Sequence, residues 1–170
     1  MTDARLILCN GADKVSINTA AIQHPKLVKK LADVFGSQCV VVAIDAKRSK
    51  EKGEEKFRIY SHSATKPTKL EAAQWSRTVA KLGAGELLVT SIDRDGTKLG
   101  YDHELLQHVM AHVNIPVIAS GGCGSLEHFL SVFSETSCDA ALAASLFHYR
   151  ELSIKNVKDY LTQNKILVRP

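Results

Sequence analysis

The sequence contains 170 residues, of which 45% are hydrophobic and 24% are charged, which is typical of one soluble domain spanning residues 1–170. The longest apolar runs, at residues 39–44, 113–119 and 140–147, are too short to cross a membrane. The first residues lack the features of a signal peptide, so we expect a cytoplasmic protein with no membrane partner. The net charge of +4 suits anionic small molecules and does not require a nucleic-acid partner.

Apolar runs and helical spacings alternate along the chain. In order, they predict a strand at 14–18, a helix at 25–35, a strand at 39–45, a helix at 70–82, a strand at 86–93, a helix at 103–112, a strand at 116–121, a helix at 126–133 and a strand at 140–145. The strand runs are nearly continuous rather than alternating, as expected of parallel strands buried on both faces. Strands separated by helices predict an α/β fold of about five βα units with a parallel sheet.

The densest charged stretch lies between the second expected strand and the second expected helix. Residues 47–52 open with basic side chains, and the charges then alternate in sign as far as Arg58. We expect a solvated loop here, with the steering of a phosphate as the alternative.

Neither the cysteines nor the histidines form a metal-binding pattern. The four cysteines are scattered, without a Cys-x-x-Cys pair, which argues against a disulfide framework or a zinc site. His108 and His112 have the i, i+4 spacing of helical zinc sites but lack the adjoining glutamate, so we expect a solvent-facing helix. No dinucleotide fingerprint follows the first strand. We therefore predict no metal and no cofactor.

Polar residues and glycines follow the expected strands. The carboxyl ends of parallel strands lie at one edge of a sheet, where α/β proteins build their sites, so these residues are expected to meet. They are Asn18 and Thr19 after the first strand, Asp45 in the second, residues 93–97 after the third, residues 120–122 after the fourth and Ser145 in the fifth. Glycines and hydroxyls suit an anion, which we expect to bind here.

Longer motifs give the sequence a specific resemblance. They are residues 11–19, 35–38, 43–48, 83–86, 90–97, 100–102, 119–122 and 141–145. These segments resemble the cyclase subunit of imidazole glycerol phosphate synthase, an enzyme of histidine biosynthesis. The resemblance extends over nearly the whole chain.

The resemblance implies the eight-stranded TIM barrel of that family, of which this chain looks like strands four to eight only, a partial barrel. The first strand of the family carries a second catalytic aspartate and the third a glycine-rich phosphate loop. Neither strand has a counterpart in this sequence. The family also usually has glycines at positions where this chain has Ser63, Ala64 and Lys69.

The reaction implied by the resemblance is an ammonia-dependent ring closure. Ammonia from a glutaminase subunit combines with a doubly phosphorylated ribulosyl-formimino aminoimidazole carboxamide nucleotide. The products are imidazole glycerol phosphate and aminoimidazole carboxamide ribotide. Closing the imidazole needs proton transfers on both sides of the reacting atoms, and therefore two carboxylates. By resemblance Asp45 is one of them; by its position alone it could cap a helix or pair with Lys47 or Arg48.

Each phosphate of that substrate requires an anion site. By resemblance, Asn18 and Thr19 form part of the first. The second would comprise Gly96, Thr97, Gly121, Gly122, Ala144 and Ser145. Taken singly, any of these could equally be an ordinary turn residue.

Charged residues also mark the opposite, N-terminal ends of the strands. Lys14 and Glu86 could form a structural ion pair at the floor of the sheet. By resemblance they belong to a charged gate through which ammonia enters. The neighbouring Asp13 matches a contact to the glutaminase subunit.

Three hypotheses remain open. The chain is part of the cyclase, or a paralogue that delivers ammonia to another acceptor, or an inactive half-barrel that retains only folding or partner binding. Because one carboxylate of the pair and one phosphate loop have no counterpart in this sequence, we expect the chain alone to be inactive. Because five strands cannot close a barrel, we also expect it to self-associate through the unpaired edges of strands 14–18 and 140–145.

Overall fold

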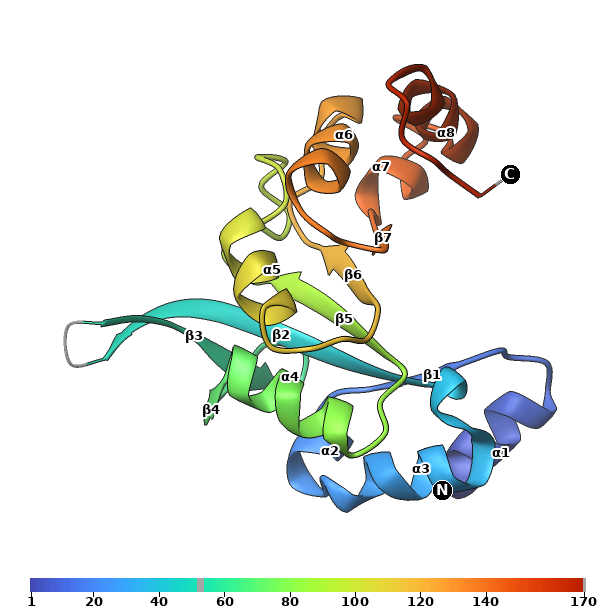
Figure 1. Ribbon diagram of the computed structural model, residues 1–170, viewed down its shortest axis with the longest axis vertical. Helices are drawn as coiled ribbons and strands as arrows, with labels where there is room; N and C mark the ends of the chain where they lie inside the picture. Colours follow the sequence, from blue (N-terminus) through green and yellow to red (C-terminus); the bar gives the residue numbers. More distant parts are fainter. Residues whose placement is uncertain (52–53, 170) are drawn as a thin grey trace.

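The computed structural model describes residues 1–51 and 54–169 (Figure 1). The helices are α1 (Thr2–Cys9), α2 (Thr19–Gln23), α3 (Lys26–Phe35), α4 (Ala72–Lys81), α5 (His103–Met110), α6 (Leu126–Glu135), α7 (Ser145–His148) and α8 (Ile154–Gln163). The strands are β1 (Val15–Ile17), β2 (Val40–Glu51), β3 (Glu54–Ser61), β4 (Lys66–Glu71), β5 (Glu86–Ser91), β6 (Val117–Ser120) and β7 (Ala140–Ala141). Within the described residues, no helix is both long and apolar enough to cross a membrane.

Five strands pair in parallel in the order β1-β2-β5-β6-β7. Strand β2 pairs with β1 on one side and β5 on the other. Its second half, from Asp45 onward, also pairs with β3 in antiparallel orientation, and β3 pairs with β4. The β2–β3 hairpin projects from the sheet as a long ribbon (Figure 1). The predicted α/β fold with a mostly parallel sheet is therefore confirmed.

All five expected strands and all four expected helices are present, with shifted ends. The strand expected at 39–45 continues to Glu51, whereas the strand expected at 140–145 contains only Ala140 and Ala141, because α7 begins at Ser145. The sequence patterns gave no indication of the remaining elements. These are α1, α2, α7, α8, β3 and β4.

The expectation of a solvated loop at residues 47–58 is wrong. The described part of this stretch forms β2 and β3, while Lys52 lies outside the described residues. Phe57 and Ile59 are buried on either side of the half-exposed Arg58, which is the period of two that a strand requires. The guanidinium of Arg48 lies over the Phe57 ring, 4.9 Å from its centroid. Alternate burial of this kind makes the stretch a ribbon, and Arg48, which pairs with Phe57, lies on its apolar face.

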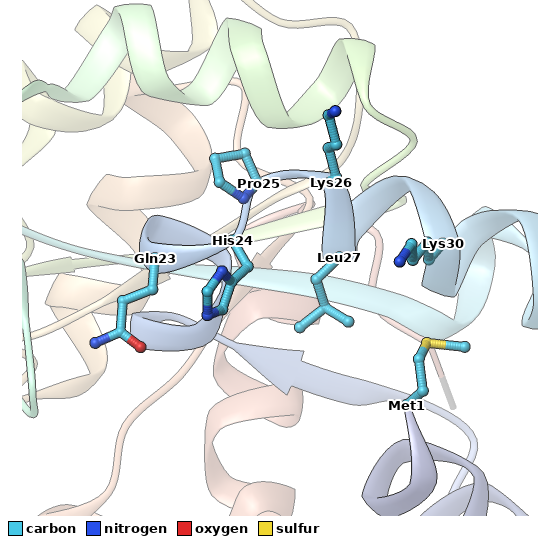
Figure 2. A pocket seen from close by; sticks show the side chains of 7 residues that line it. All are labelled: Met1, Gln23, His24, Pro25, Lys26, Leu27 and Lys30. Carbon is cyan, nitrogen blue, oxygen red and sulfur yellow. The ribbon is translucent and has the colours of Figure 1, made fainter.

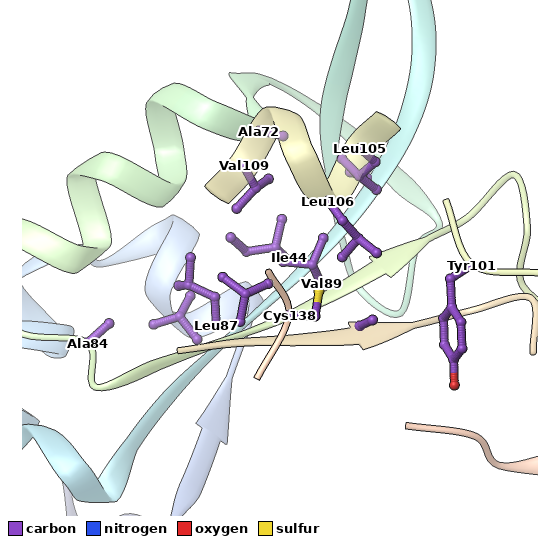
Figure 3. Packing of buried hydrophobic residues seen from close by; sticks show 14 of the residues in the cluster. Ile44, Ala72, Ala84, Leu87, Val89, Tyr101, Leu105, Leu106, Val109 and Cys138 are labelled. Atoms are coloured by element: carbon purple, nitrogen blue, oxygen red, sulfur yellow. The ribbon is translucent and has the colours of Figure 1, made fainter. Parts of the chain in front are cut away.

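The parallel strands are fully covered on one face only. Ile44, Leu87 and Val89 are completely buried and belong to the same core cluster as Leu106 and Val109 of α5 (Figure 3). Most of the alternate residues of β2, β5 and β6 are only half-buried, including Ala43, Leu88 and Ile118, although Val41 in the first half of β2 is buried. Burial on both faces, as expected from the continuous apolar runs, is therefore wrong.

The parallel sheet ends in short strands on both sides. In the described parts of the chain, β1 pairs with β2 alone and β7 with β6 alone. Each outer strand therefore has one edge without a strand partner. Whether this edge recruits another chain stays a prediction.

Candidate functional site

Asp45 lies at the point in β2 where its pairing with β5 approaches its end and the ribbon begins. Strand register places Asp45 opposite Thr90 of β5, and Thr90 opposite Ser120 of β6. Residues paired across parallel strands point to the same face, so these three side chains form one row on the half-exposed face. A carboxylate and two hydroxyls thus lie side by side towards the carboxyl ends of the strands.

The half-buried Asp45 carboxylate has a defined partner. Asn18 Nδ2, at the end of β1, donates a 2.8 Å hydrogen bond to Asp45 Oδ2. Burial raises the pKa of the Asp45 carboxyl, the Asn18 hydrogen bond opposes this, and the negative charge of Asp95 adds to the rise, so that the net shift is upward. A carboxyl of this kind holds its proton at higher pH than an exposed aspartate, which suits proton transfer.

Two of the alternative roles for Asp45, a helix cap and a pair with Arg48, do not fit the structure, whereas a pair with Lys47 stays an alternative. It caps no helix, because β2 continues to Glu51. The Arg48 guanidinium is directed to other carboxylates, since it bonds Asp102 and Glu104 at 2.7 Å each.

A pocket of about 310 Å³ lies next to this row of side chains. It brings together five of the residues predicted for the second phosphate site: Gly96, Gly121, Gly122, Ala144 and Ser145. The pocket also contains Thr90 and Lys98, which the sequence analysis missed, and Asp95 and Ser120, which it expected at this edge without assigning them to a phosphate. Thr90 could have been found by assigning alternate strand residues to one face.

Gly121 and Gly122 have backbone conformations and surroundings that a side chain would disrupt. Their φ angles are +89° and +99°, in the region that favours glycine. A Cβ on Gly121 would lie 2.8 Å from the Ser91 carbonyl oxygen, and one on Gly122 would lie 2.2 Å from that of Gly100. The backbone at these positions therefore packs directly against the end of β5 and the loop that follows it.

The other predicted phosphate-binding residues lie outside this pocket lining. The Thr97 hydroxyl donates to the Arg94 carbonyl oxygen at 2.7 Å, which is a turn contact. Asn18 contacts Asp45, and the Thr19 hydroxyl oxygen accepts a hydrogen bond from the backbone N–H of His62 at 2.8 Å. The structure therefore brings Asn18 to the carboxylate and Thr19 to the β3–β4 turn.

A buried carboxylate anchors the segment between the pocket and α5. Asp102 is 3% exposed, accepts hydrogen bonds from the Ser91 hydroxyl at 2.9 Å and the Leu105 N–H at 3.2 Å, and pairs with Arg48. The Arg48 backbone N–H also donates to Asp93 at 2.7 Å. These contacts tie the ribbon, the end of β5 and the start of α5 together.

At the opposite end of the strands, the expected ion pair is confirmed. Lys14 Nζ donates to Glu86 Oε1, with Lys14 exposed and Glu86 half-buried. Asp13 is exposed next to Lys14. The roles of these three residues in ammonia entry and partner binding stay predictions.

The expectation of a solvent-facing helix does not hold for His108. Its Nε2 lies 2.7 Å from Glu71 Oε1, and its ring lies 5.5 Å from that of Phe57, so it is half-buried between α5 and the ribbon. His112 is exposed. Among the residues that the structure describes, no three His, Cys, Asp or Glu side chains are grouped so that they could hold a metal ion.

A second hollow lies at the junction of α2 and α3 (Figure 2). Its lining includes Lys26 and Lys30 on α3, and Met1 at the start of the chain. None of the predicted site residues lines it. The chemistry-bearing residues therefore gather at the strand ends rather than here.

A parallel sheet whose strand ends carry a half-buried carboxylate beside a glycine-lined pocket defines an α/β protein of the kind that builds its site at that edge. Residues 1–153 match the family described as histidine biosynthesis proteins, and the chain belongs to this family.

Three relatives illustrate the similarity. The chain is 57% identical, over 99% of its length, to the imidazole glycerol phosphate synthase subunit HisF of Clostridium botulinum (strain Langeland), of which it covers 66%. It is 50% identical to the same subunit of Methanopyrus kandleri, with 98% of this chain and 67% of the relative covered. It is 54% identical to that of Chlorobium phaeobacteroides, with 98% and 64% covered. The family resemblance is confirmed, and the chain spans about two thirds of the length of these relatives.

Proposed function

We propose that this chain forms part of the cyclase of imidazole glycerol phosphate synthase. The reaction would join glutamine-derived ammonia to the phosphoribulosyl-formimino aminoimidazole carboxamide nucleotide and release imidazole glycerol phosphate and aminoimidazole carboxamide ribotide. The similarity to HisF subunits supports this proposal over a paralogue with another acceptor. The observation that carries it is the meeting of Asp45 and the glycine-lined pocket at one edge of the sheet.

In this proposal Asp45 transfers a proton during ring closure. Its raised pKa lets it hold a proton nearer neutral pH, and the Asn18 hydrogen bond fixes its direction. A general acid or base in the right place contributes about 10²–10⁴-fold to a rate. The second carboxylate of the reaction would come from strands that this chain does not supply.

The pocket would hold one phosphate of the substrate. Glycines allow backbone N–H groups to approach an anion closely, and the hydroxyls of Thr90, Ser120 and Ser145 add donors. Asn18 and Thr19 would serve the other phosphate. This role requires Thr19 to donate its hydroxyl proton to the phosphate while its oxygen accepts from His62.

The five parallel strands would correspond to strands four to eight of an eight-stranded barrel, with residues 1–170 as one partial barrel domain. The half-exposed face with Ala43, Leu88 and Ile118 supports this assignment, because the inner face of such a barrel is filled by side chains from all its strands. Without those from other strands this face remains half-exposed.

The glutaminase subunit would bind at the opposite end of the strands, where Asp13 is exposed. The Lys14–Glu86 pair lies between that surface and the sheet, and would form part of the ammonia gate. Opening the gate would require this ion pair to separate. The pair is half-exposed, so the cost of separation is small.

The test supplies the N-terminal third of the Clostridium botulinum relative as a separate chain and measures ammonia-dependent consumption of the nucleotide. We expect turnover with the complemented chain and a loss of about 10²-fold or more for Asp45→Asn, with substrate binding retained. Asp33→Asn, on the exposed face of α3, is the matched control and should leave turnover unchanged. Equal turnover in Asp45→Asn and the control would refute the role of Asp45.

A further inference from the structure

Lys98 is the one cationic side chain among the described residues that line the glycine-rich pocket. The other charged residue of the lining is Asp95, whose negative charge opposes an anion. The remaining donors are uncharged backbone and hydroxyl groups. A phosphate that enters this pocket therefore has one nearby side chain that could balance its charge.

In the structure Lys98 is engaged elsewhere. Its Nζ lies 2.7 Å from both carboxylate oxygens of Glu151, in the segment after α7, and Glu151 does not line the pocket. The two side chains are 46% and 41% exposed. Ion pairs with this exposure are weak and exchange readily, so Lys98 can leave Glu151 at little cost.

The backbone of Lys98 points to a function for its side chain. Its φ of +59° lies in the left-handed region, where glycine is favoured and other residues are strained. The segment around Gly124 packs closely against this backbone, because a Cβ on Gly124 would lie 2.6 Å from the Lys98 carbonyl oxygen. A lysine thus occupies a position suited to glycine, and strained residues of this kind gather at functional sites.

We propose that Lys98 is a phosphate-binding residue of the pocket, and that Glu151 competes with the phosphate for its ammonium group. The proposal rests on the phosphate site of the proposed function. The lysine side chain has a flexible stem of four carbons and a compact charge. The Nζ of Lys98 can therefore turn away from Glu151 and into the pocket that Lys98 lines. A phosphate carries a larger negative charge than a carboxylate near neutral pH and has more acceptor oxygens, so it displaces Glu151 from the Lys98 ammonium group.

The experiment titrates the full chain with inorganic phosphate at low ionic strength. Affinity is measured by calorimetry, and location by the shifts of the Gly121, Gly122 and Ser145 amide resonances. The variants are Lys98→Met, Glu151→Gln and the double variant. The matched controls are Lys29→Met and Asp33→Asn, because these residues form a similarly exposed ion pair on α3.

We expect Lys98→Met to weaken phosphate binding about tenfold, the usual scale for one charged hydrogen bond. Glu151→Gln should tighten binding about threefold, because it removes a competitor held by a weak surface pair. In the Lys98→Met background Glu151→Gln should have no effect, since Glu151 acts only through Lys98. The control variants should match the parent chain.

Two results would overturn the proposal while leaving the phosphate site in place. Lys98→Met could bind like the parent, or Glu151→Gln could weaken binding as Lys98→Met does, which would make the pair a structural clasp. If Lys98→Met does not fold, the direction of the Glu151→Gln effect decides alone. If the pocket amide resonances of the parent chain do not shift when phosphate is added, the phosphate site of the proposed function is refuted. The role of Lys98 is then refuted as well.

Discussion

Replacing Gly122 with alanine should destabilise the chain far more than the same change at Gly96. A Cβ on Gly122 would lie 2.2 Å from the Gly100 carbonyl oxygen and 2.9 Å from Arg94 Cβ. The Gly100 backbone cannot easily move away, because its N–H donates a 2.8 Å hydrogen bond to the Gly122 carbonyl oxygen. Gly96 also has a positive φ, +75°, but a Cβ there would meet no atom within 4 Å.

The magnitude follows from these two contributions. A left-handed backbone costs an L-residue about 1–2 kcal/mol, and forcing extra atoms into packed surroundings adds about 1–3 kcal/mol. Alanine recovers about 0.4–1 kcal/mol by restricting the unfolded chain. We therefore expect Gly122→Ala to lower the free energy of unfolding by about 1–5 kcal/mol and Gly96→Ala by about 0–2 kcal/mol, so that the packing contribution separates the two.

Urea unfolding followed by tryptophan fluorescence measures both changes. Trp75 is the only tryptophan in the sequence and is 4% exposed, so its emission reports loss of the core. Midpoints compared at equal slope give the difference in unfolding free energy. A difference of about 0.5 kcal/mol is the ordinary scatter between independent sites. If the unfolding free energies of the two variants differ by no more than this, the close packing argued for Gly122 is refuted.

Three further predictions concern stability and assembly. Ala64 has a φ of +62°, so Ala64→Gly should stabilise the chain by about 1 kcal/mol in urea unfolding. Lys69→Gly is the control and should not stabilise it, because Lys69 has no positive φ. Stabilisation by both substitutions would contradict this. The raised pKa of Asp45 means that the folded state binds its proton more tightly than the unfolded state, so stability falls as pH rises from the ordinary value of 3.8 through the folded pKa. Asp45→Asn should remove this fall and should be more stable than the parent chain at pH 7. A variant that is less stable than the parent at pH 7 would contradict this. The unpaired edges of β1 and β7 should make the chain self-associate at micromolar concentration in sedimentation experiments, and a cooperatively unfolding monomer would disprove this.

The predictable part of the fold came from apolar periodicity, and the missed part from short or charged elements. The parallel strands and helices α3, α4, α5 and α6 have runs that a pattern can detect, whereas α8, which is as long as α3 and buries Val157 and Leu161, was not predicted. Helix α7 contains four residues and β7 two, too few for any period to appear. The ribbon was not predicted because its frequent charged residues obscure the alternation in which Phe57 and Ile59 are buried.

The site was predictable to the extent that its residues follow strands in the sequence. Gly121, Gly122 and Ser145 were assigned to one edge, and the structure brings them into one pocket. The Asp45–Thr90–Ser120 row depends on strand register, which the sequence does not specify directly. The Lys98–Glu151 contact joins loops 53 positions apart, and no local pattern predicts it.

The position of β2 in the sheet also has a consequence for the order of folding. Its outer half meets β3 through pairs such as Ala46 with Ile59, which are 13 positions apart, whereas its inner half meets β5 through pairs such as Val42 with Leu87, 45 positions apart. Closing the shorter loop costs less chain entropy, so the ribbon can form first and present β2 as a template for β5. Mutations at Ile59 should then slow refolding, while mutations at Leu87 should mainly speed unfolding. Stopped-flow kinetics on Ile59→Val and Leu87→Ala give the kinetic φ-value of each position, which is the share of the stability loss that appears in the folding rate. A higher φ-value at Leu87 than at Ile59 would refute this order of folding.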